Sequence, residues 1–348
     1  MTSTLRSSVV TLIVGPSEHG VVQHAAASAV DAGHDVARFT SPADVVPAAL
    51  AAYPAVHIHY TDRLFGATAA SAALCLGDIA DRLPGRLVVT LHDVPFPDGT
   101  DHGRRRAAAY VDVAARADAI VVASHAEAER LALCGVEARI DVVRLPVRLE
   151  RRDAPERRDA PERRHTRRSV PSAGVLGFIY PGKGHDDVID AAAELQTAST
   201  VIAFGGASPG HADVVTGLSD TAARRGQSFV ATGYLDDESL TKAIRSVGVG
   251  VVPARRTSAS ASLNRWIGAG RRPVVARNSY TAEFAALAPG LVRLYDPTTP
   301  GALTSALRSS LDEPRSTWHD DNIPPCLSPA ATATALRSIF GCVQSCNR

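Results

Sequence analysis

The chain has 348 residues, of which 45% are hydrophobic and 21% charged, and its formal net charge is +1. At roughly 150 residues per domain this length favours two domains, and the composition is that of an ordinary globular chain. Disorder throughout, a collagen helix and a coiled coil are excluded, and without an overall basic excess no nucleic-acid partner is expected.

The apolar runs and the cysteine spacing of this sequence carry expectations about its compartment. The longest apolar run near the start, 9–14, is shorter than a signal-peptide core or a membrane helix, so we expect a cytoplasmic protein. The five cysteines show no paired spacing, which predicts neither a disulfide framework nor a zinc site. Only two of the 37 basic residues are lysines, Lys183 and Lys242, so each lysine is an unusual choice for this chain.

In the first half of the chain, short Val- and Ile-rich runs alternate with Ala-rich stretches of helical character. Continuous apolar strands separated by helices are typical of a parallel sheet that is covered on both faces. The runs lie at 9–15, 35–40, 55–60, 86–93, 119–124 and 141–146. They predict the six strands of a Rossmann-like domain over residues 1–148.

A tandem repeat interrupts this pattern, because RRDAPE occurs at 151–156 and again at 157–162. Between 151 and 168, eight arginines stand beside four acidic residues, two prolines and no large apolar residue. Such a segment has nothing to bury, so 149–170 is predicted to be a solvated Arg-rich linker. Contact with an anionic membrane or nucleic acid is the alternative interpretation.

After the linker the alternation resumes and predicts a second Rossmann-like domain over 171–326. Its apolar runs lie at 173–180, 199–207, 227–234, 247–254, 272–277 and 291–296. A last helical stretch, 328–340 within the segment 327–348, is expected to cross back over the first domain. The predicted fold class is therefore α/β, with two doubly wound parallel-sheet domains facing a cleft, and ligands are expected at the carboxyl ends of the strands.

The first candidate site in the second domain is a turn between its first strand and the following helix. Lys183 stands there between Gly182 and Gly184. A flexible ammonium between two glycines meets a phosphate as a point charge without steric obstruction. A solvated turn with an incidental lysine is the alternative.

A second candidate follows the run 247–254. It consists of small hydroxylated residues before a helix, which cap the helix and leave N–H groups for an anion, although a plain Ser-rich cap explains them equally well. The candidate residues for donor binding in this loop are Arg256, Ser258, Ser260, Ser262, Leu263 and Asn264. Arg255, Arg271 and Arg272 are near enough in sequence to add positive charge.

In the first domain, two segments at the ends of predicted strands carry polar residues. The glycine-containing loop from Gly15 through His19 to Gly20 is a candidate substrate loop, although a tight turn explains it equally well. His92 and Asp93 end the fourth strand, where the histidine is suited to donate to a sugar hydroxyl and Asp93 to hold it. His57 and His59 share one face of a strand, but without a third ligand they do not predict a metal site.

With these motifs in order, the chain resembles family 4 of the GT-B glycosyltransferases. Residues 177–191, GFIYPGKGHDDVIDA, are similar to the family's GRLxxEKGxDxLIEA, and 229–240 and 268–276 are similar to FLGxVxDEEL and AAGxPVVA. In the first domain, VVTLHD and IVVASHAEAERLALCGV resemble the family's histidine-ending strand and its VVxxSxxxxxxLxxxGV segment. The resemblance covers about residues 9 to 312.

The resemblance implies that Lys183 binds the donor diphosphate and that His92 lies near the transferred sugar. Three acidic or basic positions of the family differ here. At the position of the family's arginine this chain has Phe178. The positions of the family's two glutamates are occupied by Thr257 and Arg265, or by Arg256 and Asn264 if the extra residue in GRRP shifts the alignment by one. The SASAS backbone and Asn264 are our candidates to replace the glutamates.

The leading hypothesis is a hexosyltransferase of cell-envelope or exopolysaccharide synthesis, retaining and metal-independent as the resemblance implies. It would use a nucleotide sugar as substrate, no cofactor, and a glycan, glycolipid or small-molecule acceptor. The alternatives are a non-catalytic GT-B protein that binds a nucleotide sugar or a partner protein, and a sugar-nucleotide epimerase. An additional hypothesis is peripheral contact of the basic stretch 102–106 with the inner face of the membrane.

Overall fold

The computed structural model describes residues 7–150, 171–320 and 322–345 and divides into two compact units. Unit 1 contains the chain up to Pro146 and the C-terminal segment from Pro325 onward, and unit 2 runs from Val147 to Pro324. Most of the expected linker, 149–170, lies outside the described residues.

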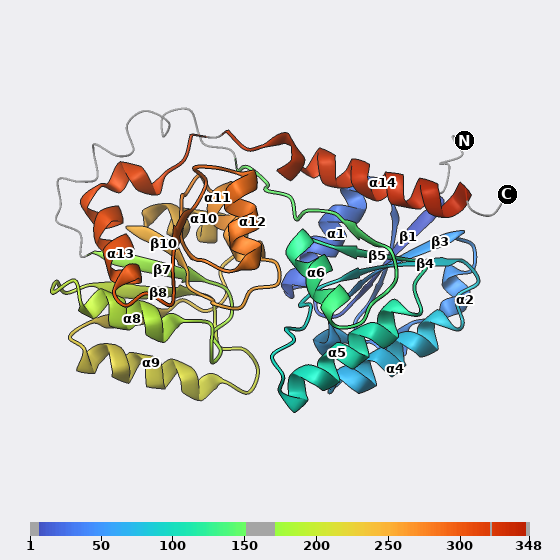
Figure 1. Cartoon of the computed structure of the whole chain (residues 1–348), viewed down its shortest axis with the longest axis horizontal. Coiled ribbons are helices and arrows are strands. Elements are labelled where there is room, and N and C mark those ends of the chain that lie inside the picture. Colours follow the sequence, from blue (N-terminus) through green and yellow to red (C-terminus); the bar gives the residue numbers. More distant parts are fainter. Residues whose placement is uncertain (1–6, 151–170, 321, 346–348) are drawn as a thin grey trace. The chain divides into compact units, whose positions relative to one another are not determined.

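The sheet of unit 1 has six parallel strands in the order β2-β1-β3-β4-β5-β6 (Figure 1). Its strands are β1 (Val9–Val14), β2 (Asp35–Phe39), β3 (Ala55–Tyr60), β4 (Arg86–Leu91), β5 (Ala119–Val122) and β6 (Ile140–Val142). All six predicted strands are confirmed. Five of them end earlier than their apolar runs, because the last residues of those runs turn into the loops at the carboxyl edge, whereas β3 ends at the last residue of its run.

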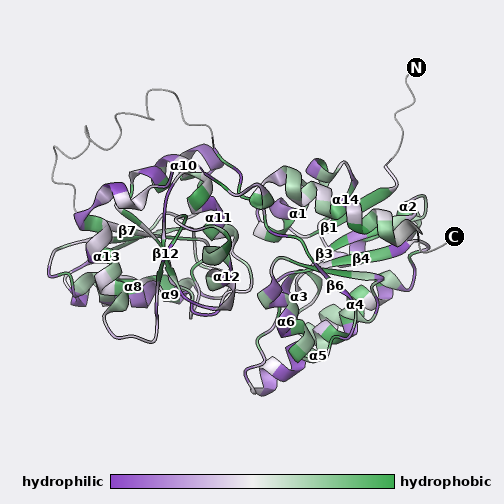
Figure 2. Ribbon diagram, turned by 45° about the horizontal axis from the view of Figure 1, so that its top comes forward, coloured by the Kyte–Doolittle hydropathy of each residue, from purple (hydrophilic) through white to green (hydrophobic). Residues whose placement is uncertain are grey.

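Seven helices accompany this sheet among the described residues of unit 1. They are α1 (Gly20–Ala32), α2 (Pro47–Leu50), α3 (Asp62–Phe65), α4 (Ala69–Ala80), α5 (Asp101–Ala114), α6 (His125–Leu133) and α14 (Pro329–Ser345). Most of the sheet is coloured as hydrophobic in Figure 2, as expected of strands buried between helices.

The two faces of this sheet differ in chemistry because side chains alternate along each strand. One face is largely apolar and includes Leu12, Ile58 and Val89. The other face mixes apolar residues such as Val88 with buried polar side chains. These are Thr11 on β1, His57 and His59 on β3, and Thr90 on β4, with His92 just after β4.

The C-terminal helix α14 packs against unit 1 and runs alongside α1. Leu336, Ile339 and Phe340 join Val9 and Ala55 in one buried cluster. The Thr332 hydroxyl also donates to the Arg144 carbonyl at 3.0 Å. The last segment of the chain is therefore part of the core of unit 1.

Unit 2 repeats the architecture with the strand order β12-β11-β10-β7-β8-β9, again all parallel. Its strands are β7 (Ser172–Leu176), β8 (Thr200–Phe204), β9 (Ser228–Ala231), β10 (Val249–Val252), β11 (Val274–Ala276) and β12 (Arg293–Tyr295). Its helices are α8 (His185–Ala193), α9 (Ala212–Arg224), α10 (Asp237–Ser246), α11 (Ala261–Gly268), α12 (Ser279–Leu287) and α13 (Ala302–Asp312). The six strands predicted for this half are confirmed.

Two strand glycines let α11 approach the sheet of unit 2 closely. A Cβ on Gly250 would lie 2.7 Å from the Trp266 ring, and one on Gly174 would lie 3.0 Å from it. Trp266 is fully buried above these two strands, β10 and β7. The packing of this one side chain fixes the position of α11, whose first residues reach the carboxyl edge of the sheet.

Candidate functional site

The strand order of unit 2 marks one position at which a ligand is expected. β7 is the first strand of the unit, with β8 on one side and β10 on the other, so the order reverses between β7 and β10. In open α/β sheets, ligands bind outside the carboxyl ends of the strands at such a switch point. The Lys183 turn follows β7, and the Ser-rich loop follows β10, so both candidate donor-binding segments adjoin it.

The Lys183 turn is built on left-handed backbone conformations. Gly177, Gly182 and Gly184 have φ values of 110°, 83° and 90°, which suit glycine because they place a Cβ close to backbone atoms. The Lys183 ammonium lies 5.8 Å from the centre of the Tyr180 ring. Gly184 is also the N-cap of α8, so the lysine stands directly before a helix N-terminus.

Two contacts hold the Lys183 turn against the end of β10. A Cβ on Gly184 would lie only 2.9 Å from the Pro253 side chain, so the two loops touch. Arg255 then reaches α8, where its guanidinium donates to the Asp187 carboxylate, with a distance of 2.9 Å from Nη2 to Oδ1. The structure thus brings together two segments that lie about 70 positions apart in the sequence.

The Ser-rich loop caps α11 as its composition predicts. The Ser260 hydroxyl accepts from the Leu263 N–H at 3.1 Å and lies 3.1 Å from the Ser262 hydroxyl. Ser258 and Asn264 are buried. The first turn of α11 carries no acidic residue, whereas the first turn of α8 contains Asp186 and Asp187. The N-terminus of α11 is therefore the better anion site of the two.

The four arginines near this loop do not lie together. Helix α11 runs from the carboxyl edge of the sheet back to its amino edge, so the residues after it reach the opposite edge. Arg271 donates to the Val247 and Gly248 carbonyls, just before β10 begins, and burial lowers the pKa of its guanidinium to about 9. Arg272 donates its backbone N–H to Thr317 there. The expectation that these two add charge to the site is wrong, and only Arg255 and Arg256 follow the carboxyl end of β10.

Arg265, one of the positions where the resemblance places a family glutamate, makes contacts of its own. It forms an ion pair with Glu150, 2.5 Å from Nη1 to Oε1, and donates to the backbone carbonyl of Asp237 at 3.0 Å. It also donates to the Thr241 hydroxyl at 3.2 Å. Its guanidinium therefore binds to α10 and to the start of unit 2.

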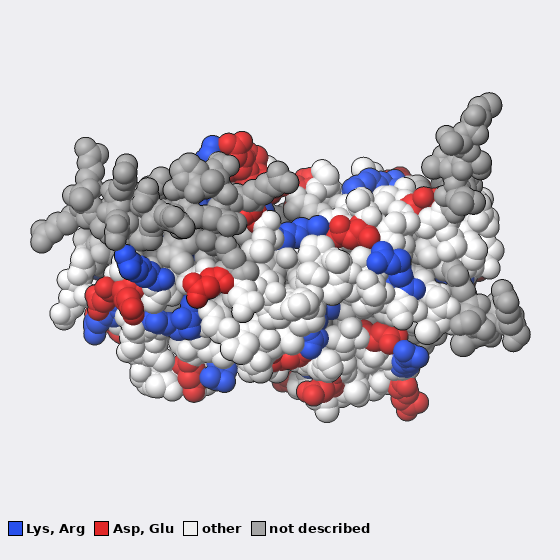
Figure 3. Space-filling view, turned by 90° about the horizontal axis from the view of Figure 1, so that it is seen from above, with Lys and Arg blue, Asp and Glu red and all other residues white. Residues whose placement is uncertain are grey.

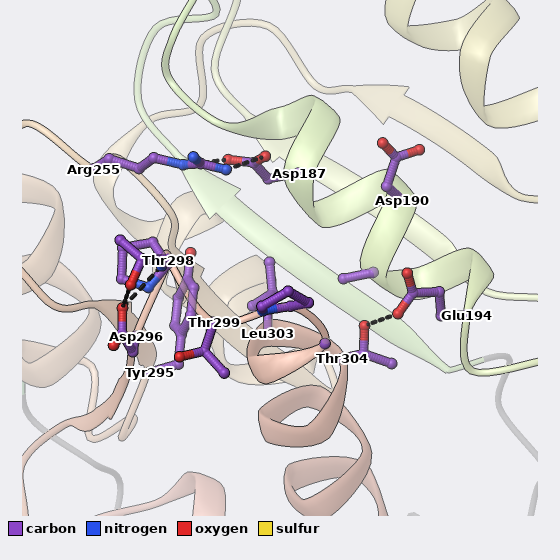
Figure 4. A pocket seen from close by; sticks show the side chains of 14 residues that line it. Asp187, Asp190, Glu194, Arg255, Tyr295, Asp296, Thr298, Thr299, Leu303 and Thr304 are labelled. Atoms are coloured by element: carbon purple, nitrogen blue, oxygen red, sulfur yellow. Dashed lines mark hydrogen bonds and ion pairs between the residues drawn. The ribbon is translucent and has the colours of Figure 1, made fainter.

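A pocket of about 260 Å³ lies beside the Lys183 turn, between α8 and the loop that joins β12 to α13. Figure 4 shows the Arg255–Asp187 pair at one side of it and the hydrogen bond from Thr304 to Glu194 at another. Its carboxylates come from Asp187, Asp190, Glu194 and Asp296. Sequence reasoning did not predict this pocket, because the β12–α13 loop has no motif that pairs it with α8.

In unit 1 the candidate substrate loop follows β1, again at the point where the strand order reverses, between β1 and β3. Gly15 has φ 117°, and a Cβ there would lie 2.8 Å from Leu64. His19 is the N-cap of α1, and its Nδ1 accepts from the Val21 N–H at 3.3 Å. Burial lowers the pKa of His19, as the neutral ring of a capping acceptor requires. Gly20 is the first residue of α1, with open space around it.

His92 and Asp93 lie at the carboxyl edge of this sheet, but Asp93 does not bond to His92. The Asp93 carboxylate accepts from the Thr61 hydroxyl at 2.9 Å, and the ring of His92 is held by His59, with 3.0 Å between His92 Nε2 and His59 Nδ1. Asp93 has φ 51°, a rare conformation for a residue with a Cβ that turns its side chain toward β3. The expected Asp93–His92 contact is replaced by one to the neighbouring strand.

Five histidine rings gather at one face of the sheet, and they come from α1, the residue before β2, β3 and the residue after β4. His24 on α1 packs edge-on against His59 and His92, and His34 packs against His57. Burial lowers the pKa of His34 and of His92 to about 4, and those of His57 and His59 fall well below the usual value. The sequence contains one indication of this cluster, namely the histidines of HIHY (57–60) and TLHD (90–93). They indicate a cluster only once β3 and β4 are known to be neighbouring strands.

The basic stretch at 102–106 does not form a uniformly exposed patch. Arg104 pairs with Asp101 on the surface, whereas Arg106 turns inward and pairs with Asp62, 2.7 Å from Nε to Oδ2. On the face shown in Figure 3, acidic and basic side chains are interspersed. Within the described ranges, no helix has the length and apolarity to cross a bilayer, and no three His, Cys, Asp or Glu side chains are arranged to hold a metal ion.

Comparison with solved structures shows the same architecture at low sequence identity. Sucrose-phosphate synthase from Thermosynechococcus elongatus superposes with a TM-score of 0.73 at 16% identity, over 97% of this chain and 100% of that one. The chain has the GT-B fold. HepE of Anabaena, solved in complex with UDP-glucose, gives a TM-score of 0.70 at 16% identity over 97% and 99% of the two chains. The galactosyltransferase WaaB of the lipopolysaccharide outer core gives 0.62 at 13% identity over 96% and 99%.

The family model of Glycosyltransferase Family 4 matches residues 46–151 of this GT-B chain. The expected resemblance to that family is therefore confirmed, over a segment that begins one residue before α2 and includes β3 to β6. No curated protein matches the chain.

Proposed function

We propose that the chain transfers a hexose-type sugar from a nucleoside-diphosphate sugar to a glycan, glycolipid or small-molecule acceptor. The single observation that carries this is the junction at the β7–β10 switch point. There Lys183, two left-handed glycines and the Ser260-capped N-terminus of α11 adjoin one another. A cation and free backbone N–H groups at one strand edge are suited to a diphosphate. The GT-B fold and the family match support the assignment.

In this proposal the nucleoside diphosphate binds unit 2, and the contact of His92 with a sugar is taken from the resemblance to family 4. Negative charge grows on the diphosphate as the bond to the sugar breaks, so cations and helix dipoles near it lower the barrier. Lys183 and the N-terminus of α11 supply this stabilisation. Arg255 contributes less, because Asp187 already neutralises it.

Retention of the anomeric configuration and independence of added metal are further parts of the proposal. Both follow from the resemblance to family 4, and each has a direct test. Product analysis by proton NMR should show the donor's anomeric configuration in the product. Turnover should persist after treatment with EDTA, and loss of turnover that Mg²⁺ restores would contradict metal independence.

A non-catalytic binding protein is the second candidate, and one feature favours it. Residues 254–277 contain no aspartate or glutamate, and Arg265 stands where the resemblance suggests a carboxylate. Binding of a nucleotide sugar without transfer or donor hydrolysis, across a broad acceptor panel, would support this alternative. Conversion of the donor into its epimer without any acceptor would instead indicate an epimerase.

The deciding experiment is calorimetric titration of the protein with UDP, GDP, ADP and dTDP. We expect micromolar binding of one of them and a loss of roughly tenfold to a hundredfold in Lys183→Ala, because one charge-assisted hydrogen bond is removed. Lys242→Ala is the matched control, since the only other lysine pairs with Glu238 on the surface of α10. Equal affinity in Lys183→Ala and wild type would refute the proposed donor site.

A further inference from the structure

The contact between His59 and His92 joins an interior histidine to one at the carboxyl edge of the sheet. The two rings are nearly parallel, with centres 5.2 Å apart and planes 19° apart, and His59 Nδ1 lies 3.0 Å from His92 Nε2. His59 comes from β3, and His92 follows the neighbouring strand β4. The two strands therefore place one hydrogen bond between two imidazoles.

Both rings are neutral near pH 7. Burial, reinforced by His57 and His92, keeps the pKa of His59 well below its usual value. Burial, with a smaller contribution from the neighbouring His19, lowers the pKa of His92 to about 4. A neutral imidazole has one N–H donor and one bare nitrogen, so one ring of the pair donates and the other accepts.

The surroundings of His59 decide which ring donates. Its Nε2 is buried and has no hydrogen-bond partner among the described residues. A buried N–H without an acceptor is rarer in proteins, and costs more free energy, than a buried acceptor atom without a donor. The proton of His59 therefore belongs on Nδ1, where it has an acceptor. His59 Nδ1–H then donates to His92 Nε2, and the single proton of His92 lies on Nδ1.

The backbone around His92 is fixed independently of this bond. The His92 N–H donates to the Tyr60 carbonyl at 2.8 Å, and its own carbonyl accepts from the Tyr110 hydroxyl at 2.6 Å. The ring also packs against His24 from α1, while His19 approaches from the β1–α1 loop. With the main chain held in this way, the tautomer is the property of His92 that the contact with His59 controls.

We propose that His59 is a positioning residue that fixes His92 as the Nδ1–H tautomer, so that His92 acts as a neutral hydrogen-bond donor to a substrate oxygen. The identity of that oxygen, a sugar hydroxyl, rests on the proposed function. The tautomer does not, because it follows from contacts within unit 1. His92 thus acts by donating a hydrogen bond and does not remove a proton as a general base.

The tautomer is tested by nitrogen NMR on the full chain labelled with ¹⁵N-histidine. The His92 signals are assigned by their loss in His92→Gln. At pH 7.5 we expect a protonated Nδ1 and a bare Nε2. His59→Phe keeps a ring but removes the donor. The preference of a free imidazole for the Nε2–H form then competes with the cost of an N–H that faces no acceptor, so we expect a mixture of both His92 tautomers in place of one. A wild-type His92 protonated at Nε2, or an unchanged pattern in His59→Phe, overturns the proposal.

Two further variants separate this role from general packing. His59→Asn places an amide N–H where Nδ1 stands and should restore the Nδ1–H tautomer of His92, also if the phenylalanine variant fails to fold. His57→Phe is the matched control, because His57 is equally buried on the same strand face but bonds to Thr90, 2.7 Å from Nε2 to Oγ1. It should leave the tautomer of His92 unchanged, and a change as large as that of His59→Phe would refute a specific role of His59.

The effect of the His59 variants on catalysis is measured separately, in a sugar-transfer assay. His59→Phe should lower kcat roughly tenfold, the size of one lost hydrogen bond, with KM little changed, and His59→Asn should recover most of the loss. The wild-type rate should show no titration of His92 between pH 6 and 8. An unchanged kcat in His59→Phe overturns the role in the reaction. Lack of donor binding by the wild type would refute the proposed function while the NMR result still decides the tautomer.

Discussion

Arg106 connects three parts of unit 1 at the carboxyl edge of its sheet. Its guanidinium donates to both carboxylate oxygens of Asp62 and to the Asp93 carbonyl at 3.0 Å. The side chain of Asp62 is only 11% exposed, so this pair is held largely away from water. Arg106 therefore supports the strained Asp93 backbone next to His92.

Replacing Arg106 by leucine should lower the free energy of unfolding by roughly 2 to 3 kcal/mol, because the Asp62 carboxylate is left buried without its partner. Arg104→Leu on the same helix is the matched control. Its pair with Asp101 is exposed on both sides and should contribute less than about 1 kcal/mol. Urea unfolding followed by circular dichroism measures both, and equal midpoints for the two variants would contradict the structural role of Arg106.

Single residues were predictable where local sequence alone sets their place. Lys183 stands between glycines after a strand, and the structure finds it in that turn, at a switch point. The partner of His92 was not predictable, because His59 becomes its neighbour only through the pairing of β3 with β4. Asp93 was misassigned for the same reason, since its hydrogen-bond partner Thr61 follows β3.

The start of α8 and the end of β10 form one structural element of the proposed donor site. They meet where Gly184 packs on Pro253, and Arg255 adds its ion pair to Asp187 in the first turn of the helix. This contact sets the distance from the Lys183 turn to the loop that caps α11. A side chain at position 184 would therefore disturb both candidate segments together.

Gly184→Ala should lower the free energy of unfolding of unit 2 by roughly 2 to 4 kcal/mol, the sum of left-handed strain and a displaced Pro253. Gly182→Ala is the control, with a similar φ of 83° but no atom within 4 Å of the new Cβ, and should cost about 1 kcal/mol from strain alone. Both tryptophans, Trp266 and Trp318, belong to unit 2, so their fluorescence during urea unfolding measures the difference. Equal losses would show that the Pro253 contact is unimportant.

At the scale of elements the sequence predicted nearly all of the fold, and the errors share one cause. All twelve strands lie within or next to predicted apolar runs, because the central strands of a sheet covered on both faces are largely apolar. Arg271 was assigned to the ligand edge because it is close in sequence to the Ser-rich loop. Helix α11 separates the two, and its length carries Arg271 to the amino edge.

The two units differ in how many buried neutral histidines they contain. Among the described residues, burial lowers the pKa values of His19, His34, His57, His59 and His92 in unit 1. In unit 2, burial does the same for His185, to about 4. Protonation of any of these rings is therefore less favourable in the folded protein than in the unfolded chain.

This difference determines how each unit responds to acid. A histidine with a pKa of about 4 when folded and 6.5 when unfolded binds fewer protons in the native state. Its stabilising contribution is therefore complete above about pH 6.5 and is lost as the pH falls toward 4, by about 1.4 kcal/mol per pH unit for each such residue. Unit 1 contains several such histidines, so their losses of folding stability add up over the same pH range.

We therefore expect unit 1 to unfold at a higher pH than unit 2 during acid titration. Tryptophan fluorescence reports on unit 2 alone, whereas far-ultraviolet circular dichroism reports on both units. Ellipticity should decline between pH 6 and 4 before the fluorescence changes. His57→Phe removes one buried titrating ring and should move this first transition to lower pH, whereas His102→Gln, at an exposed position of α5, should leave it in place. Fluorescence that changes first would assign the acid-sensitive core to unit 2, and the histidine cluster would then not limit the stability of the molecule.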